Sequence, residues 1–385
     1  MNSLSEANTH FALDLFQQFK KSKKDNIFYS PLSITSALAM TYSGAQGNTA
    51  LQIGQVDVSF LYICLIRLIS LLASLGNVHH QFQKLLTELK KPTDAYELSI
   101  ANRLYGEKTF QFQQEYMENV KKFYLAGVES ADFINAAEES RKKINSWVES
   151  QTNGKIKDLF PDSSLSSAIL VLVNAVYFKG QWDKKFDKEY TVEEKFWLNK
   201  VTTKPVQMMK QTNSFNFTEL KDMQAKILEI PYKHKDLSMM LLLPNEVDGL
   251  KKLEDKLTAE KLIEWTSSQN MRERFVDLYL PRFKVEESYD LKDTMMSLGM
   301  LDAFSPQDAD FSGMTGSRSL VVSKILHKSF VEVNEEGTEA AAATGIEFGL
   351  LSPRAYSFHC DHPFLFFIKH NKTNSILFLG RVSSP

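Results

Sequence analysis

Phe358-His-Cys-Asp-His-Pro-Phe-Leu-Phe-Phe-Ile368 is a stretch near the C-terminus in which a proline precedes five consecutive large apolar residues. A second apolar run, residues 376–379, follows after a few polar residues. Apolar runs of this length, separated by polar turn residues, are typical of β-strands that are buried on both faces. We therefore predict that the two runs form an antiparallel hairpin inside a β-sheet.

Further strands and helices are predicted upstream of this hairpin. Residues 169–178 are apolar except for Asn174 and are rich in β-branched side chains, which favours a buried strand. Residues 137–151 place Ile144 and Val148 on one face of a helix. An N-terminal helix is indicated by apolar residues four positions apart, namely Phe11, Leu15 and Phe19. We predict the α+β class and, since no Pro/Gly/Ser-rich linker or repeat divides the chain, a single domain over residues 1–385.

Composition restricts the partners and the location that we expect. The chain carries 45 basic and 47 acidic side chains, so its formal net charge is −2. Sequence-independent binding of nucleic acid needs a clustered excess of Lys and Arg, so we expect no nucleic-acid partner. The N-terminal residues lack the order of a signal peptide, and Cys64 and Cys360 are too few for a disulfide framework. We predict a cytoplasmic protein without a signal peptide, with release to the extracellular space by a non-classical route left open.

Residues 58–75 depart from the composition of the rest of the chain. They are nearly all apolar, and Arg67 is their single charged residue. The stretch reaches the length of a membrane-spanning helix, but a central Arg costs about 2.5 to 3.5 kcal/mol in such a helix. We therefore expect no membrane span and favour an additional helix packed on the surface. A splicing or gene-annotation artefact is the alternative interpretation.

Val333-Asn-Glu-Glu-Gly-Thr-Glu-Ala-Ala-Ala-Ala-Thr344 joins two glutamates and a glycine to a run of small residues. This stretch resembles the hinge of inhibitory serpins. Leu172-Val-Asn-Ala-Val-Tyr-Phe-Lys-Gly-Gln-Trp182 resembles the central strand of that family, and residues 358–368 are similar to its C-terminal motif. The chain therefore resembles the ovalbumin-like intracellular branch of the serpins, and within it the squamous cell carcinoma antigen group.

The resemblance implies the serpin fold, with a large central β-sheet, further sheets, surrounding helices and an exposed reactive-centre loop at about residues 335–358. It implies that a protease cuts this loop between Leu351 and Ser352. It also implies a hinge, which enters the sheet after cleavage and consists of Glu335, Glu336, Gly337, Thr338, Glu339, Ala340, Ala341, Ala342, Ala343 and Thr344. A buried hydrogen-bond cluster beneath the opening sheet, the shutter, is implied at Ser30, Ser33, Asn174 and His327. Taken alone, His327 reads instead as a core histidine with a backbone partner.

The residues of the loop themselves suit insertion into a sheet. From Thr338 onward, side chains at every second position share one face of an extended chain, and on this face they are uncharged. Glu339 and Glu347 lie on the opposite face. Small uncharged residues can enter between existing strands, whereas Ala340–Ala343 alone would equally suit a piece of helix. Serpin loop insertion is a known example of strand addition.

The side chains around the cut predict the class of protease. Leu351 suits the hydrophobic primary pocket of a chymotrypsin-like serine protease, and Leu350 suits the apolar second pocket of a cathepsin-like cysteine protease. Phe348 and Pro353 flank this pair and complete the bait. Arg354 is a competing bait for a trypsin-like enzyme, although it lies beyond the usual spacing. The expected partner is a target protease, and we expect a monomer.

Other functions receive less support from the sequence. A non-inhibitory serpin that acts in binding, storage or as a chaperone is the main alternative, but members of that kind tend to carry bulky or charged hinge residues. We find no catalytic motif and predict neither an enzyme nor a cofactor. His359 and His362 would point to opposite faces if they lay on one strand, so we predict no metal site.

Overall fold

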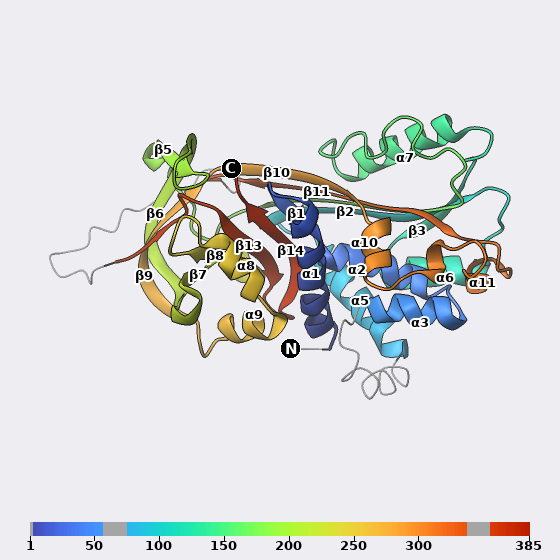
Figure 1. The fold of residues 1–385 in the computed structure, drawn as a ribbon, viewed down its shortest axis with the longest axis horizontal. Coiled ribbons are helices and arrows are strands. Elements are labelled where there is room, and N and C mark those ends of the chain that lie inside the picture. The colour runs from blue at the N-terminus through green and yellow to red at the C-terminus, as the bar shows by residue number, and fades with distance from the viewer. Residues whose placement is uncertain (1–2, 57–74, 337–354) are drawn as a thin grey trace.

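Two β-sheets form the centre of the computed structural model, which describes residues 3–56, 75–336 and 355–385 (Figure 1). Within these residues the larger sheet has nine strands: β1 (Ile27–Tyr29), β5 (Val192–Trp197), β6 (Thr203–Leu220), β7 (Ala225–Pro231), β8 (Leu237–Pro244), β9 (Arg272–Pro281), β12 (Tyr356–His359), β13 (Phe364–His370) and β14 (Ser375–Val382). Their order is β1-β14-β13-β8-β7-β6-β9-β12, and β5 also pairs with β6.

The smaller sheet is the one that positions the candidate site. In the described part of the chain it contains five strands: β2 (Tyr96–Glu107), β3 (Gly127–Ala131), β4 (Leu170–Gly180), β10 (Phe283–Asp290) and β11 (Val322–Val333). Their order is β10-β11-β4-β2-β3. β4 and β11 are parallel neighbours, whereas each of them is antiparallel to the strand on its other side.

Helices cover the five-stranded sheet on both faces, so the predicted α+β class is confirmed. The α-helices described are α1 (Ser3–Ser22), α2 (Pro31–Tyr42), α3 (Gly47–Val56), α5 (Leu75–Leu89), α6 (Gln114–Tyr124), α7 (Ala137–Gln151), α8 (Leu250–Lys256), α9 (Ala259–Trp265), α10 (Lys292–Ser297) and α11 (Ser312–Thr315). Short 3-10 helices are η1 (Lys188–Tyr190), η2 (Lys221–Met223), η3 (Lys233–Lys235) and η4 (Asp302–Phe304). Figure 1 shows α7 alone above the sheet and α1, α2, α3, α5 and α6 below it.

Helix α2 lies in the centre of the molecule, beneath the five-stranded sheet. Ser30 caps its N-terminus, since the Ser30 side chain accepts a hydrogen bond from the amide of Ser33. Pro31 follows at the first helical position, where a missing N–H costs nothing. Every residue from Pro31 to Thr41 is buried, including the hydroxyl-bearing side chains of Ser33 and Ser36.

The predicted C-terminal hairpin is confirmed. Strands β13 and β14 pair antiparallel, with Phe366 opposite Gly380, and every residue of both strands is buried. A Cβ on Gly380 would lie 2.6 Å from the Phe366 ring and 2.9 Å from the carbonyl oxygen of Ile27. Only glycine therefore fits where these three strands meet.

Two further sequence predictions are confirmed along the chain. The helix predicted at residues 137–151 is α7, and Ile144 and Val148 on its inner face pack against Val171 and Val173 of β4. The strand predicted at 169–178 is β4, which begins one residue later and ends two residues later. α7 therefore forms a second apolar cluster with the upper face of the sheet, while the lower face contributes to the main core.

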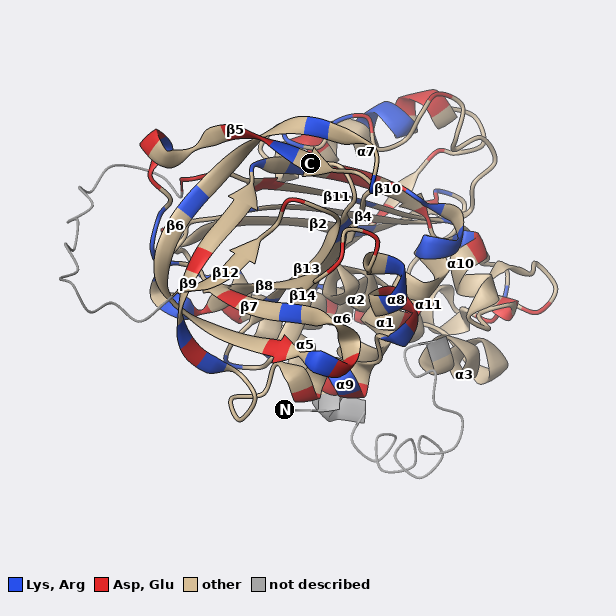
Figure 2. Ribbon diagram, turned by 60° about the vertical axis from the view of Figure 1, so that its left-hand side comes forward, with Lys and Arg blue, Asp and Glu red and all other residues tan. Residues whose placement is uncertain are grey.

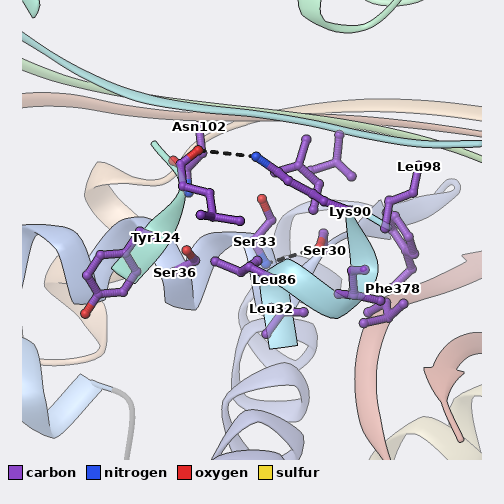
Figure 3. Close-up of a pocket in the computed structure, with 15 residues that line it drawn as sticks. Ser30, Leu32, Ser33, Ser36, Leu86, Lys90, Leu98, Asn102, Tyr124 and Phe378 are labelled. Carbon is purple, nitrogen blue, oxygen red and sulfur yellow. Dashed lines mark hydrogen bonds between the residues drawn. The ribbon is translucent and has the colours of Figure 1, made fainter. Parts of the chain in front are cut away.

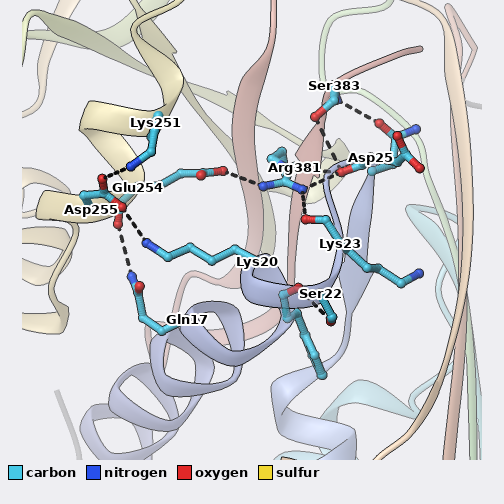
Figure 4. A network of polar contacts seen from close by, with 12 residues as sticks. Gln17, Lys20, Ser22, Lys23, Asp25, Lys251, Glu254, Asp255, Arg381 and Ser383 are labelled. Atoms are coloured by element: carbon cyan, nitrogen blue, oxygen red, sulfur yellow. Dashed lines mark hydrogen bonds and ion pairs between the residues drawn. The ribbon is translucent and has the colours of Figure 1, made fainter.

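A buried polar network connects strand β14, close to the C-terminus, with neighbouring elements of the fold (Figure 4). Arg381 of β14 is 5% exposed, and its guanidinium donates to Glu254 at 3.0 Å and to the backbone oxygens of Lys23 and Asp25 at 2.7 Å. An Arg with this many partners can remain charged in the interior. The network joins β14 to α8 and to the segment that follows α1.

Charge and hydropathy agree with the composition. Figure 2 shows basic and acidic segments interspersed along the ribbon. No helix in the ranges 3–56, 75–336 and 355–385 is long and apolar enough to cross a membrane. The atypical segment 58–75 lies outside these ranges except for Leu75, where α5 begins.

Candidate functional site

The structure describes only part of the predicted reactive-centre loop. The reactive bond Leu351-Ser352, the bait residues Phe348, Leu350 and Pro353, and the hinge from Gly337 to Thr344 lie outside the described residues. Glu335 and Glu336, which begin the hinge, are described, as are the four shutter residues. The candidate site therefore consists, in the described structure, of the residues at the two ends of the loop and of the neighbouring five-stranded sheet.

Glu335 is a buried anchor at the upstream end of the loop. Its carboxylate is 2% exposed and accepts hydrogen bonds from Arg282 Nε at 2.7 Å and from Thr191 Oγ1 at 2.5 Å. A second guanidinium nitrogen of Arg282 lies 2.6 Å from the same carboxylate. Burial opposes ionisation, but the bonds from Arg282 and Thr191 outweigh it and hold the pKa of Glu335 below its usual value.

Two more contacts hold the chain on either side of Glu335. The indole of Trp182 donates to the backbone oxygen of Asn334 at 2.9 Å, and Glu336 forms an ion pair with Lys188. Trp182 is itself fixed by stacking on Tyr232, with ring centroids 4.6 Å apart. The segment after β11 is therefore pinned by side chains from three separate parts of the chain.

Sequence reasoning missed the partners of this anchor. Arg282, Thr191 and Lys188 lie 53, 144 and 148 residues from their glutamates. No local pattern links positions so far apart. The only available signal was chemical, because a glutamate that closes a buried strand needs a cation or hydrogen-bond donors.

The described residues at both ends of the predicted loop, about residues 335–358, belong to the folded body. Glu335 is buried, so the exposed part of the loop cannot begin there. Residues 356–358 belong to β12, where Phe358 pairs with Leu278 of β9 and is completely buried. No local pattern indicates this strand, because β12 pairs with β9, a strand distant in sequence.

The four predicted shutter residues form one hydrogen-bonded cluster. Asn174 of β4 donates to Ser33 Oγ at 2.5 Å and to the backbone oxygen of Ser33 at 3.0 Å. His327 Nδ1 bonds with Asn174 Oδ1, and the amide of Ser30 donates to His327 Nε2 at 3.1 Å. His327 and Asn174 face each other in the β11 and β4 ladder. The cluster therefore ties both strands to the start of α2.

His327 is neutral in this cluster. The side chain is completely buried, and burial lowers its pKa to about 3. Since Nε2 accepts from the Ser30 amide, the proton is assigned to Nδ1, which donates to Asn174. His327 is therefore a core histidine with a backbone partner, and its place between β4, β11 and α2 is compatible with the predicted shutter role.

The seam between β4 and β11 has a geometry suited to strand insertion. β11 ends at Val333, which lies beside the anchor at Glu335, and the upper part of the seam pairs Val331 with Phe178. A chain that turned back after Glu335 would run antiparallel to β11 and, because β4 is parallel to β11, antiparallel to β4 as well. One parallel ladder could thus be replaced by two antiparallel ladders, which are slightly more stable per residue.

His359 and His362 do not lie on one strand, which differs from the arrangement assumed when no metal site was predicted there. β12 ends at His359, so the two residues do not share a strand. His359 bonds with Glu194 at 2.9 Å and stacks on Tyr279, whereas His362 bonds with the backbone oxygen of Pro244 at 2.7 Å. Across the described ranges, no group of three or more His, Cys, Asp or Glu side chains could hold a metal ion.

Comparisons with known proteins agree with this geometry. Residues 6–385 match the serpin (serine protease inhibitor) family. The chain is 66% identical to human Serpin B3 and 48% identical to the leukocyte elastase inhibitor of Equus caballus, with complete coverage of both chains in each case.

Solved structures give the same result. Uncleaved ovalbumin superposes with a TM-score of 0.88 at 40% identity, and a loop-inserted structure of a cleaved ovalbumin mutant with a TM-score of 0.86 at 40% identity. Both matches cover all of this chain and all of the other. The predicted serpin fold is therefore confirmed, and the chain belongs to the ovalbumin-like branch of the serpin family.

Proposed function

We propose that this protein is a suicide-substrate inhibitor of proteases, which acts by inserting its cleaved loop between β4 and β11. One observation carries the proposal: the loop leaves the body at Glu335, next to a parallel seam whose middle is held closed by the polar cluster of Asn174 and His327. The hydrogen bonds that close this seam can be replaced by those of an inserted strand, which would also cover the apolar side chains of β4 and β11 again. Serpin B3 and the leukocyte elastase inhibitor are similar along their whole lengths.

The covalent step starts at Leu351. The protease nucleophile, a Ser hydroxyl or a Cys thiol, attacks the carbonyl carbon of Leu351, and the bond from that carbon to the nitrogen of Ser352 breaks. The nitrogen leaves as the new amino terminus after it takes a proton from the protease. Leu351 remains bound to the protease as an acyl group until water hydrolyses it.

Insertion then competes with hydrolysis. Each main-chain hydrogen bond that the loop makes with β4 or β11 contributes about 0.5 to 1.5 kcal/mol, and burial of Ile346 and Phe348 adds to this. The anchor at Glu335 fixes the point at which the chain reverses. Because Leu351 is carried along with the loop, the bound protease is dragged away from its starting position and its active site is deformed before water acts.

The bait residues lead us to propose two classes of target. Leu351 suits a chymotrypsin-like serine protease, and Leu350 suits a cathepsin-like cysteine protease. The test is to incubate the protein with a panel of both classes and to look for complexes that survive denaturing gels. Mass spectrometry of the complex and of the released peptide should place the acyl bond on Leu351; cleavage after Arg354 would refute this assignment.

Loop cleavage without a complex separates inhibition from a storage or binding role. If the loop can insert, cutting it with a protease that is not trapped should raise the thermal midpoint by tens of degrees, because the native fold is kinetically held. An unchanged midpoint after a verified cut would refute insertion and favour the non-inhibitory alternative. Ovalbumin, whose cleaved mutant has been solved with the loop inserted, shows that the fold admits this state.

Location and assembly complete the proposal. We propose that the protein works in the cytoplasm as a monomer that meets proteases released there. Cell fractionation and size-exclusion chromatography with light scattering test these two points. A dimer at micromolar concentration would refute the second.

A further inference from the structure

A small cavity lies beneath the five-stranded sheet, between helices α2 and α5 and the strands β2 and β4 (Figure 3). Its volume is about 20 Å³. Most of its wall is apolar, including Leu86 of α5, Val176 of β4 and Phe378 of β14. The cavity also touches Ser33, so it is contiguous with the shutter cluster.

Two buried polar atoms of this wall have no hydrogen-bond partner among the described residues. Ser36 of α2 is 1% exposed, and Asn102 of β2 is 9% exposed. Within the part of the chain that the structure describes, neither Ser36 Oγ nor Asn102 Oδ1 accepts or donates a hydrogen bond. A buried polar group without a partner costs free energy and is rare in folded proteins, so each of the two atoms requires an explanation.

The position of these atoms suggests what they bind. Figure 3 shows the side chain of Ser36 on the helix below the cavity and Asn102 hanging from the sheet above it. A buried water needs a cavity of at least about 10 to 15 Å³ and two to four polar partners. The volume fits one water and is too small for a larger polar ligand. The mostly apolar wall offers few further hydrogen-bond partners.

We propose that the cavity is a binding site for one ordered water molecule that bridges Ser36 and Asn102. The water donates one hydrogen to Asn102 Oδ1 and makes its second bond with the hydroxyl of Ser36. Both orphan atoms are then satisfied. Lys90, whose ammonium group donates to the backbone oxygen of Leu125 at 3.2 Å, closes the cavity at one side.

The bridge extends the shutter from β4 to β2. Asn102 pairs with Asn174 across the β2 and β4 ladder, so two asparagines lie side by side above α2. Asn174 is bonded to Ser33 directly, and Asn102 is bonded to Ser36 through the water. β2 and β4 are thus tied to the helix together, while β11 is tied to it by His327. Opening of the seam separates these two attachments, and the water stabilises the closed sheet on the β2 side.

Paired variants on α2 test the proposal. Thr35 provides the matched control, because its hydroxyl is also buried and without a partner in the described ranges but does not line the cavity. Removing an orphan hydroxyl should be neutral or stabilising, and Ala is the better helix former. We therefore expect Thr35→Val to leave the thermal midpoint unchanged or raise it. If the water is present, Ser36→Ala removes one of its partners and should lower the midpoint by roughly 1 to 3 °C.

A rise or no change in Ser36→Ala would mean a dry cavity and would overturn the proposal. The double-mutant cycle with Asn102→Ala is the second measurement, since both substitutions break the same bridge. The loss in the double variant should be clearly smaller than the sum of the single losses, and additive losses would contradict a shared water.

Direct observation completes the test. A crystal structure of the intact protein should show a density peak within about 2.6 to 3.2 Å of both Ser36 Oγ and Asn102 Oδ1. Either an empty cavity or direct protein partners for both atoms would refute the site. Neither result depends on protease inhibition, so this proposal and the proposed function can fail separately.

Discussion

The C-terminal hairpin of β13 and β14 and the seam between β4 and β11 are both central pairs of buried strands, but they are held together differently. The hairpin is antiparallel, its strands are joined by a short turn, and its middle is filled by apolar residues such as Phe366 and Leu379. The seam is parallel, and its partners Asn174 and His327 are 153 residues apart. A buried polar cluster occupies its middle.

This difference shows how one molecule can combine a fixed sheet with a sheet that opens. Separating the hairpin would expose many apolar side chains, at about 25 cal/mol per Å² of surface. Separating the seam also exposes apolar side chains such as Val331 and Phe178, but an inserted strand can cover them again and can replace the broken hydrogen bonds. The polar cluster therefore holds the seam closed while leaving it capable of admitting a strand.

Among the tests of the difference between the hairpin and the seam, Thr338→Arg should have the largest effect. An Arg on the inserting face would need to enter the seam, and burial of an unpaired charge costs several kcal/mol. Hydrolysis should then overtake insertion, so the yield of covalent complex should fall at least tenfold while cleavage of the loop continues. Glu339→Arg places the same charge on the opposite face and serves as the control; equal losses in both variants would contradict the face assignment.

Asn174→Ala should show how strongly the polar cluster closes the seam. It removes the bonds from β4 to Ser33 and to His327, and it leaves a buried His without its partner. We expect a loss of about 2 to 4 kcal/mol in the free energy of unfolding, measured by urea titration, and faster loss of inhibitory activity at 45 °C. Ile368→Val in the hairpin should cost about 0.5 to 1.5 kcal/mol without this faster inactivation. Parallel behaviour of the two variants would remove the distinction between the regions.

The pH dependence of stability tests the contribution of His327 to the polar cluster of the seam. His327 is neutral in the fold because its pKa is lowered to about 3, whereas in the unfolded chain it titrates near 6.5. The stabilisation is therefore complete above pH 6.5 and is lost as the pH falls from about 6.5 towards 3. Between pH 6.5 and 5 we expect a loss of about 2 kcal/mol that His327→Gln does not share, measured as the difference between the two urea curves. Identical pH slopes would refute the neutral buried state.

Glu335→Gln should have the smallest effect of the four substitutions in the seam and the loop. The amide keeps the shape of the side chain but loses the charge that pairs with Arg282, a residue that is 42% exposed and can find water instead. We expect about 1 kcal/mol of destabilisation and a moderate loss of complex yield. Glu336→Gln, whose partner Lys188 is exposed, should have almost no effect on stability. A larger effect from Glu336 than from Glu335 would contradict the assignment of the anchor.

Sequence reasoning succeeded where a pattern was local. The hairpin, β4 and α7 each follow from a run or a period within a few residues. The predicted bounds of β4 and α7 are correct to within two residues, whereas β14 ends three residues beyond the predicted run. The grouping of Ser30, Asn174 and His327, which lie far apart in the chain, was predicted through family resemblance alone, and the structure shows that they form one hydrogen-bonded cluster. Arg282 and Thr191 were missed, and so was β12, whose pairing with β9 no short pattern encodes.

The sequence by itself identified the C-terminal hairpin, β4 and α7 as buried elements, and it placed small uncharged residues at alternate positions after Thr338. Only the tertiary structure decided that β4 and β11 run parallel beside the exit at Glu335, and that Ser36 and Asn102 face one small cavity. The physical reason is the separation in sequence between the residues that interact. Periodicity reports the environment of neighbouring residues, whereas strand order, ion pairs and cavities depend on residues brought together from distant parts of the chain.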